Sequence, residues 1–292
     1  MKRLCIILFA FAAVLSAYAQ NLTVLHMNDT HSHIDPERSG KYAGRGGVVE
    51  QAAYIDSVRF ADGKDNVLLL HAGDFSQGTS YFTELNGDIE IDVLNAMGFD
   101  AVCLGNHEFD NGMDELARRI RNLDVPVVCA NYDFTGSPLE GLVKPYVILE
   151  KSGRKIGIIG LLTDVTSVVD KNIADQLAYR HPADAANEYA KLLKIGQRCD
   201  LVICLTHLGY EGEMYNDPEL AAATRNVDVI VGGHSHTLLK DLKNVYNLDG
   251  EPVAIVTDWK WGLDVGNLKV SFKPQMLYRK YLDLLPENVF SH

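Results

Sequence analysis

Basic residues are scarce in this sequence relative to acidic ones. Its 292 residues include 27 Lys and Arg against 39 Asp and Glu, which gives a formal net charge of -12. The chain therefore lacks the basic surface that a nucleic-acid backbone requires. We expect no nucleic-acid partner, and any anionic ligand would need a local source of positive charge.

Cysteine is also sparse, and no two cysteines are spaced as C-x-x-C. The chain has five, so a structural zinc site built from such pairs is not expected. Cys103, Cys129 and Cys204 lie in or beside apolar runs, where we expect buried free thiols. If the protein is exported, a disulfide could form among these three cysteines and Cys199. The sequence does not show which of them would pair.

Long apolar runs are missing except at the N-terminus. Lys2 and Arg3 precede the apolar run 4–13, and Ala17-Tyr18-Ala19 follows as an A-x-A cleavage site. This pattern predicts a signal peptide over residues 1–19 and a mature chain that begins at Gln20 in the periplasm or outside the cell. An uncleaved anchor or a buried N-terminal helix is the alternative. The run is short for a membrane span, and we expect no membrane-spanning segment.

The remaining sequence alternates apolar strand-like runs with helical stretches, which predicts a layered α/β fold. Most of the apolar runs are continuous, as in strands covered on both faces. A hairpin is expected around Ser152-Gly153, and no linker or repeat divides residues 20–274, which we take as one catalytic domain before a tail, 275–292. The predicted strands are Leu22–Met27, Val67–Ala72, Ala101–Leu104, Val125–Ala130, Tyr146–Leu149, Lys155–Leu161, Leu201–Thr206, Val227–Val231, Val253–Asp258 and Leu263–Phe272. The predicted helices are Val48–Phe60, Ile89–Met97, Asp114–Leu123, Asp184–Arg198 and Pro218–Thr224.

Five of these strands end in residues of the kinds that bind metal ions. In order they carry D-x-H, G-D, G-N-H-E, a single His and G-H-x-H. Each element alone is a weak signal, but ligands in α/β sheets bind beyond the carboxyl ends of strands. The ordered set therefore predicts one metal site built from Asp29, His31, Asp74, Asn106, His207, His234 and His236.

Seven nitrogen and oxygen ligands exceed what one tetrahedral ion needs, so we expect two divalent ions. Asp74 is the expected bridge; Asp29, His31 and His236 would complete one ion, and Asn106, His207 and His234 the other. Zinc and manganese are the first candidates, and iron and cobalt also suit these ligands. Two such ions can activate water and clamp the oxygens of an in-line displacement, which suits phosphate esters. Because the motifs contain no Ser or Cys nucleophile beside a base, we expect direct attack by a metal-held hydroxide.

The motif set resembles that of the calcineurin-like metallophosphoesterases. Within them, the segment 95–110, which ends in N-H-E-F-D, resembles the 5'-nucleotidase family, which includes periplasmic bacterial 5'-nucleotidase/UDP-sugar hydrolases. The resemblance runs from Leu22 to about Phe272. It implies a four-layer α/β/β/α sandwich of two mixed sheets, with the dinuclear metal site at the strand ends.

The resemblance also implies roles for individual residues. His107 and Asp110 would form a catalytic pair, in which His107 donates to the phosphate and Asp110 orients its ring. A helix cap is the alternative for Asp110. Asn131 falls where the family has a substrate-side residue. Arg45 lies in a glycine-rich segment and would approach a phosphate, unless that segment is a flexible surface loop.

The expected activity is hydrolysis of phosphomonoesters, foremost 5'-nucleotides to nucleoside and phosphate. A phosphodiesterase or nucleotide-sugar pyrophosphatase of the same fold is an alternative, as is a non-catalytic subunit that binds phosphorylated ligands. His236 leaves the subfamily open, because some nucleotidases have Gln or Asn there. Two-domain members stack the base on a C-terminal domain, which this sequence does not reach by His292. We therefore expect either a separate chain that supplies such a nucleotide-binding domain or another small phosphate ester as substrate.

Overall fold

Two six-stranded sheets form the centre of the protein in a computed structural model that describes residues 21–212 and 214–272. The predicted signal peptide and tail lie outside these residues. Both sheets are mixed, since β14 runs antiparallel to β1, and β12 and β7 run antiparallel to their neighbours. The first sheet has the order β14 (Gly266–Ser271), β1 (Asn21–Met27), β2 (Val67–His71), β3 (Ala101–Cys103), β4 (Val127–Val128) and β6 (Val143–Lys144). The second sheet has the order β12 (Lys243–Tyr246), β13 (Pro252–Thr257), β11 (Val229–Gly232), β10 (Leu201–His207), β8 (Arg154–Leu162) and β7 (Tyr146–Lys151).

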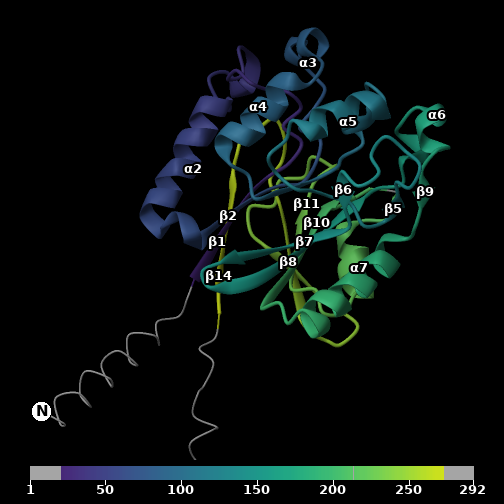
Figure 1. Cartoon of the computed structure of the whole chain (residues 1–292). Coiled ribbons are helices and arrows are strands. Elements are labelled where there is room, and N and C mark those ends of the chain that lie inside the picture. Colours follow the sequence, from purple (N-terminus) through teal and green to yellow (C-terminus); the bar gives the residue numbers. More distant parts are fainter. Residues whose placement is uncertain (1–20, 213, 273–292) are drawn as a thin grey trace, which may run out of the picture.

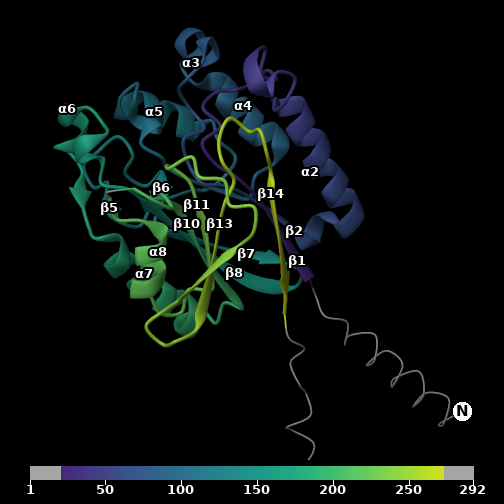
Figure 2. The ribbon, with the colours of Figure 1, turned by 180° about the vertical axis from the view of Figure 1, so that it is seen from behind.

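Helices cover the outer face of each sheet (Figure 1). The first sheet packs against α2 (Val48–Asp62), α4 (Asp88–Met97) and α5 (Met113–Arg121), with α3 (Ser80–Leu85) beside α4. The second sheet packs against α7 (Pro182–Lys191) and α8 (Asp217–Ala223), which lie together in Figure 2. A small sheet of β5 (Tyr132–Asp133) and β9 (Ala178–Tyr179) and the short α6 (Lys171–Ala174) form no part of the two main sheets, but Tyr132 and Ala174 belong to the core cluster of the first sheet and its helices. The predicted four-layer α/β/β/α sandwich is confirmed.

The continuous apolar runs have the predicted cause, because both faces of the central strands are buried. In β1, Leu22 and Val24 pack into the core between the sheets, whereas Leu25 and Met27 pack against the helices. Full burial of one such side chain contributes about 1.5–3 kcal/mol. The sheets approach so closely that a Cβ atom on Gly160 would lie 2.1 Å from the Val128 carbonyl oxygen.

Most elements begin or end one or two residues from their predicted bounds, and three depart in ways that have an identifiable cause. The strand predicted at Val125–Ala130 pairs only at Val127–Val128, and Pro126 before it has no N–H for a ladder. The helix predicted at Asp184–Arg198 begins at Pro182 and changes from α to π geometry at Leu192. The last strand starts at Gly266 instead of Leu263, because a loop follows β13. The predicted hairpin is confirmed, with positive φ at both turn residues of the 152–153 pair.

Four cysteines, Cys103, Cys129, Cys199 and Cys204, are buried free thiols. Among the helices of the described ranges, none combines the length and the apolar character needed to cross a bilayer.

Candidate metal centre

The predicted ligands come together at one edge of the sandwich, where strands of both sheets end. Asp29 and His31 follow β1, Asp74 follows β2, and Asn106 follows β3. From the second sheet, His207 closes β10, and His234 and His236 follow β11. Five of the seven have left-handed backbones, with φ between 48° and 78°. Such a conformation costs a non-glycine residue about 1–2 kcal/mol, and strain of this kind gathers at functional sites.

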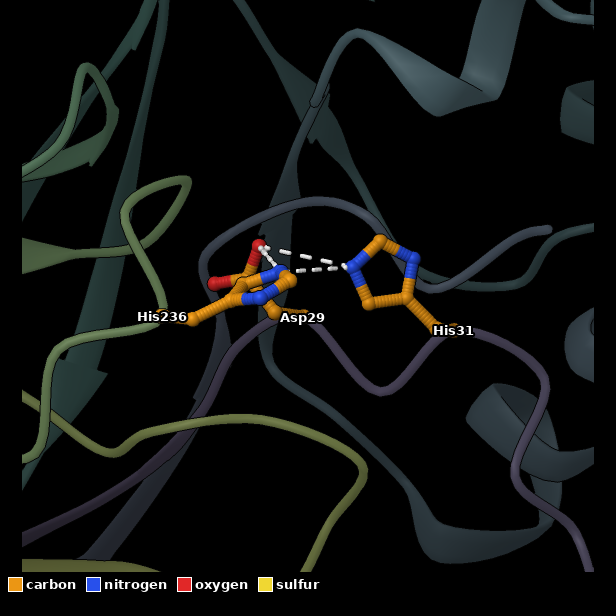
Figure 3. Close-up of side chains that lie close together, drawn as sticks. All are labelled: Asp29, His31 and His236. Carbon is orange, nitrogen blue, oxygen red and sulfur yellow. Dashed lines mark hydrogen bonds and ion pairs between the residues drawn. The ribbon is translucent and has the colours of Figure 1, made fainter. Parts of the chain in front are cut away.

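Asp29, His31 and His236 form the first cluster (Figure 3). The Nε2 atoms of His31 and His236 are 2.9 Å apart. Asp29 Oδ1 lies 3.4 Å from the His236 nitrogen and 3.8 Å from the His31 nitrogen. Two ligand atoms that each lie about 2.0–2.2 Å from one ion are about 3–3.5 Å apart. The spacing of the first cluster therefore suits three ligands of one ion.

Asp74, His207 and His234 form the second cluster. Asp74 Oδ2 is 3.0 Å from His207 Nε2 and 4.0 Å from His31 Nε2. Asp29 Oδ1 is also 3.9 Å from His207 Nε2. The two clusters therefore adjoin, and the carboxylate of Asp74 reaches toward a histidine of each.

Buried atoms without a hydrogen-bond partner test whether these residues suit metal ions. Asn106 is 4% exposed, and its Oδ1 atom has no partner in the described structure. The fully buried Nε2 atom of His207 also makes no hydrogen bond of good geometry, although the Asp74 carboxylate lies 3.0 Å away. Leaving a buried polar atom unpaired is costly, and a bound cation would satisfy both atoms. The residues present fit a pair of divalent ions, and oxygen and nitrogen donors leave the metal's identity open.

Neighbouring groups fix the orientation of the ligands. The Nδ1 atom of His207 donates to the Ala72 carbonyl oxygen at 2.7 Å, so Nε2 is the atom that would bind an ion after losing its proton. Asp29 Oδ2 accepts hydrogen bonds from the backbone N–H of His234 at 2.9 Å and from Asn28 Nδ2 at 2.6 Å. The other oxygen of Asp29 is thereby turned toward the histidines of both clusters.

The pKa values of the histidines reflect this environment. Burial lowers the pKa of His31 and of His234 to about 4, so both rings are neutral as metal ligands must be. Burial also opposes protonation of His207, but the Asp74 carboxylate outweighs it and raises the pKa of His207 to about 10. The pair of buried carboxylates thus attracts positive charge strongly.

Glycine is required where the strand ends meet. A Cβ atom on Gly105 would lie 2.2 Å from Asp74 Oδ1, and one on Gly233 would lie 2.6 Å from the Ala72 carbonyl oxygen. Neither position has room for a side chain. The glycines of the motifs therefore let the ligand-bearing loops approach one another.

Glu108 holds two of these loops together, a role that its place in the G-N-H-E motif did not reveal. Its Oε2 atom accepts hydrogen bonds from the N–H groups of Gly105 at 2.6 Å and Asp74 at 2.9 Å, and its Oε1 atom from Ser76 at 3.1 Å. Glu108 is fully buried, and burial followed by the Asp74 charge raises its pKa. Arg119 on α5, also fully buried, donates to Ser76 Oγ and to the Glu108 carbonyl. The sequence signal for this contact is that Arg119 lies three residues after Leu116, on the apolar face of a predicted helix.

His107 and Asp110 pair as predicted. His107 Nδ1 lies 2.9 Å from Asp110 Oδ2, and both side chains are about 30% exposed. The hydrogen bond to Asp110 raises the pKa of His107. Asp110 is not the N-cap of α5, which is Gly112, but it ends the short 3-10 helix His107–Phe109 through its backbone N–H. A ring nitrogen of His107 also groups with ligand atoms of His31 and Asp74, so its role as donor instead of ligand stays a prediction.

The two predicted substrate residues lie in other surroundings. Asn131 is fully buried, and its amide bonds both the N–H and the carbonyl of Leu162 at the end of β8. Arg45 is about half exposed and pairs with Asp264 at 3.2 Å. These contacts give Asn131 a structural role and hold Arg45 against the loop before β14. Contact of either residue with substrate stays a prediction.

A two-sheet sandwich with paired His and Asp clusters at its strand ends defines a metal-dependent phosphoesterase. Residues 22–238 match the family model for calcineurin-like phosphoesterases, and the chain belongs to this family. The resemblance inferred from the motifs is confirmed.

Several of the similar proteins are nucleotidases. A probable 5'-nucleotidase of Treponema pallidum (strain Nichols) is 35% identical over 271 residues, which cover 86% of this chain and 45% of that protein. The structure of a 5'-nucleotidase precursor from Thermus thermophilus matches with a TM-score of 0.78 at 36% identity, covering 86% of this chain and 51% of that one. The NAD nucleotidase of Haemophilus influenzae matches with a TM-score of 0.77 at 33% identity, covering 87% and 48%. This chain thus spans about half the length of the relatives it matches.

Proposed function

We propose that this protein hydrolyses phosphomonoesters, foremost 5'-nucleotides to nucleoside and phosphate, with two divalent metal ions. The observation that carries the proposal is the junction of the two ligand clusters, with the His107–Asp110 pair beside them. His107 has its ring 5.4 Å from that of His31, so it lies next to the metal ligands while keeping solvent access. The names of the relatives support nucleotides as the substrate class.

The residues divide the work by their protonation and position. The seven ligands would hold the two ions, which would supply charge for the phosphate oxygens and activation of water. Asp110 engages Nδ1 of His107 and so leaves Nε2 free to donate to the phosphate or the leaving oxygen. Because Asp110 raises the pKa of His107, more of the donor form is present near neutral pH.

An activity panel with metal analysis tests the proposal. AMP, a UDP-sugar, NAD and a cyclic nucleotide are offered to protein whose zinc, manganese, iron and cobalt contents are measured. Release of phosphate from AMP at about two metal ions per chain is the expected result. Cleavage of only the UDP-sugar, NAD or cyclic nucleotide would support the alternative phosphodiesterase or pyrophosphatase activity. Tight binding of AMP without turnover would support the non-catalytic alternative.

Two further expectations belong to this proposal. The first is that residues 1–19 are cleaved and the protein is exported to the periplasm or medium. The exported protein should then have the mass of a chain that begins at Gln20, and the mass of the full-length chain would contradict this expectation. The second is that a separate chain supplies a nucleotide-binding domain. Adding a candidate chain should then raise kcat/KM for AMP but not for an aryl phosphate. Equal effects on both substrates would contradict such a partner.

A further inference from the structure

The loop between β13 and β14 is attached to the backbone of the metal ligands. The N–H of Trp261 donates to the Asp29 carbonyl at 2.7 Å, and the N–H of Trp259 donates to the Thr237 carbonyl at 3.1 Å. Asn28 Nδ2 donates to the Trp259 carbonyl at 2.7 Å. Since Thr237 follows the ligand His236, this loop borders the first cluster on two sides.

Four half-buried aromatic rings gather on this loop and its neighbours, and we call them the aromatic rim: His33, Tyr42, Trp259 and Trp261. Trp261 stacks on His33 with ring centroids 4.8 Å apart and an angle of 15°. Trp259 meets Tyr42 edge to face, at 4.9 Å and 85°. The rim therefore consists of two braced pairs and leaves part of each ring accessible to solvent.

Both tryptophans have left-handed backbones, with φ of 56° at Trp259 and 61° at Trp261. This conformation is a clear outlier for a bulky side chain. Strain of this kind persists where the surrounding structure enforces it, and it concentrates at ligand sites. Two strained tryptophans beside the metal ligands therefore point to a binding role more than to packing.

The ring faces available for a ligand differ between the two pairs. The ammonium group of Lys260 lies 4.3 Å from the centroid of the Trp261 ring, and His33 stacks on that ring as well. Lys41 and Arg45 lie over Tyr42. An edge-to-face pair leaves each ring at least one face that its partner does not cover. Trp259 is therefore the ring best placed to receive a planar group.

The rim adjoins an exposed candidate ligand of the metal centre, because the N–H of Trp259 donates to the carbonyl of Thr237, the residue after His236. The side chain of His236 is 33% exposed, whereas those of Asp29 and His207 are fully buried. Solvent reaches the clusters past His107, whose side chain is 31% exposed, and past His236. An ester held there that extends past His236 lies toward Trp259.

We propose that the aromatic rim binds the base of a 5'-nucleotide, with Trp259, braced by Tyr42, as the stacking platform. This inference rests on the proposed function. Every nucleobase offers a π face, so stacking on Trp259 suits purines and pyrimidines alike. The base would then be recognised by this chain itself.

A comparison of AMP with ribose 5-phosphate tests the rim, because the two esters differ only in the base. Wild-type protein should show a higher kcat/KM for AMP than for ribose 5-phosphate. Trp259→Ala should lower kcat/KM for AMP by about 10- to 100-fold and leave that for ribose 5-phosphate unchanged. Trp259→Phe should restore most of the loss, since it keeps an aromatic face. Alanine keeps the left-handed strain at position 259, so the backbone cost is the same in each variant.

Phe60→Ala is the matched control. Phe60 is 93% exposed on α2, so this substitution also removes an aromatic ring, but at a position outside the rim. Its kinetics should match the wild type for both esters. Equal losses for both esters in Trp259→Ala, or no preference for AMP in the wild type, would overturn the proposal. If the wild type hydrolyses neither ester, the proposed function fails, and calorimetric titration with AMP decides the rim alone: weaker binding by Trp259→Ala supports it, and unchanged binding overturns it.

Discussion

Glu108→Gln is the change that tests most directly how the metal centre is held. The two oxygens of Glu108 accept three backbone N–H groups, from Gly105, Asp74 and Ser76. In the glutamine variant one of these oxygens becomes an NH2 group, which donates instead of accepting. At least one buried N–H therefore loses its acceptor, at a cost of about 1–3 kcal/mol.

That cost should appear in two measurements. For a chain of this size it corresponds to a fall in Tm of about 3–10 °C, which calorimetry of the metal-free protein would detect. The Asp74 and Asn106 loops would also be less well fixed. Substitutions of residues that orient metal ligands typically weaken metal binding about 10- to 100-fold. Competition with a chelator of known affinity would measure that change.

Glu90→Gln is the matched control. Glu90 on α4 is also buried, at 3% exposure, and neither of its carboxylate oxygens has a hydrogen-bond partner in the described ranges. Replacing Glu90 by glutamine removes no hydrogen bond that these oxygens make. Burial raises the pKa of Glu90, since it disfavours the charged carboxylate, and the neutral amide carries no such charge. Its Tm should be unchanged or higher, with wild-type metal affinity. If Glu108→Gln behaved in the same way, the clamp assigned to Glu108 would be refuted.

Three further substitutions have distinct expected results. His107→Asn should keep the metal content and lower kcat by at least ~10²-fold, and near-normal turnover would remove His107 from catalysis. Asp110→Asn replaces the charged acceptor that raises the pKa of His107 by a neutral amide, so this pKa should fall. The alkaline limb of kcat/KM, along which His107 loses its proton, should therefore move to lower pH, and an unmoved limb would contradict the pairing. Asp74→Asn should reduce metal content and activity together, because Asp74 belongs to two of the three ligand groups; full metal occupancy in this variant would show that Asp74 is not a ligand.

Much of the fold was predictable because its signals are local. Strands buried on both faces leave continuous apolar runs, as in β2 and β10. The gathering of the candidate ligands was predictable in part, because parallel strands deliver their carboxyl ends to one edge of a sheet, as at β1 and β2. That the end of β10 meets them depends on how the second sheet packs on the first. The errors fell at element ends, where one proline or a single turn decides the boundary.

The amino-acid order by itself determined the layered α/β fold, the candidate ligand residues and the His107–Asp110 contact, because each depends on short-range pattern or on motifs a few residues long. Only the tertiary structure decided what holds the ligands. Asn28 is bonded to Asp258 and Trp259, some 230 positions away, and Glu108 joins loops from two strands. These hydrogen bonds depend on the register and packing of whole sheets. A small displacement of one strand relative to another would change which groups are within hydrogen-bond distance. Sequence patterns do not encode that geometry locally, so the clamp of Glu108 and the tryptophans beside Asp29 became visible only in the folded chain.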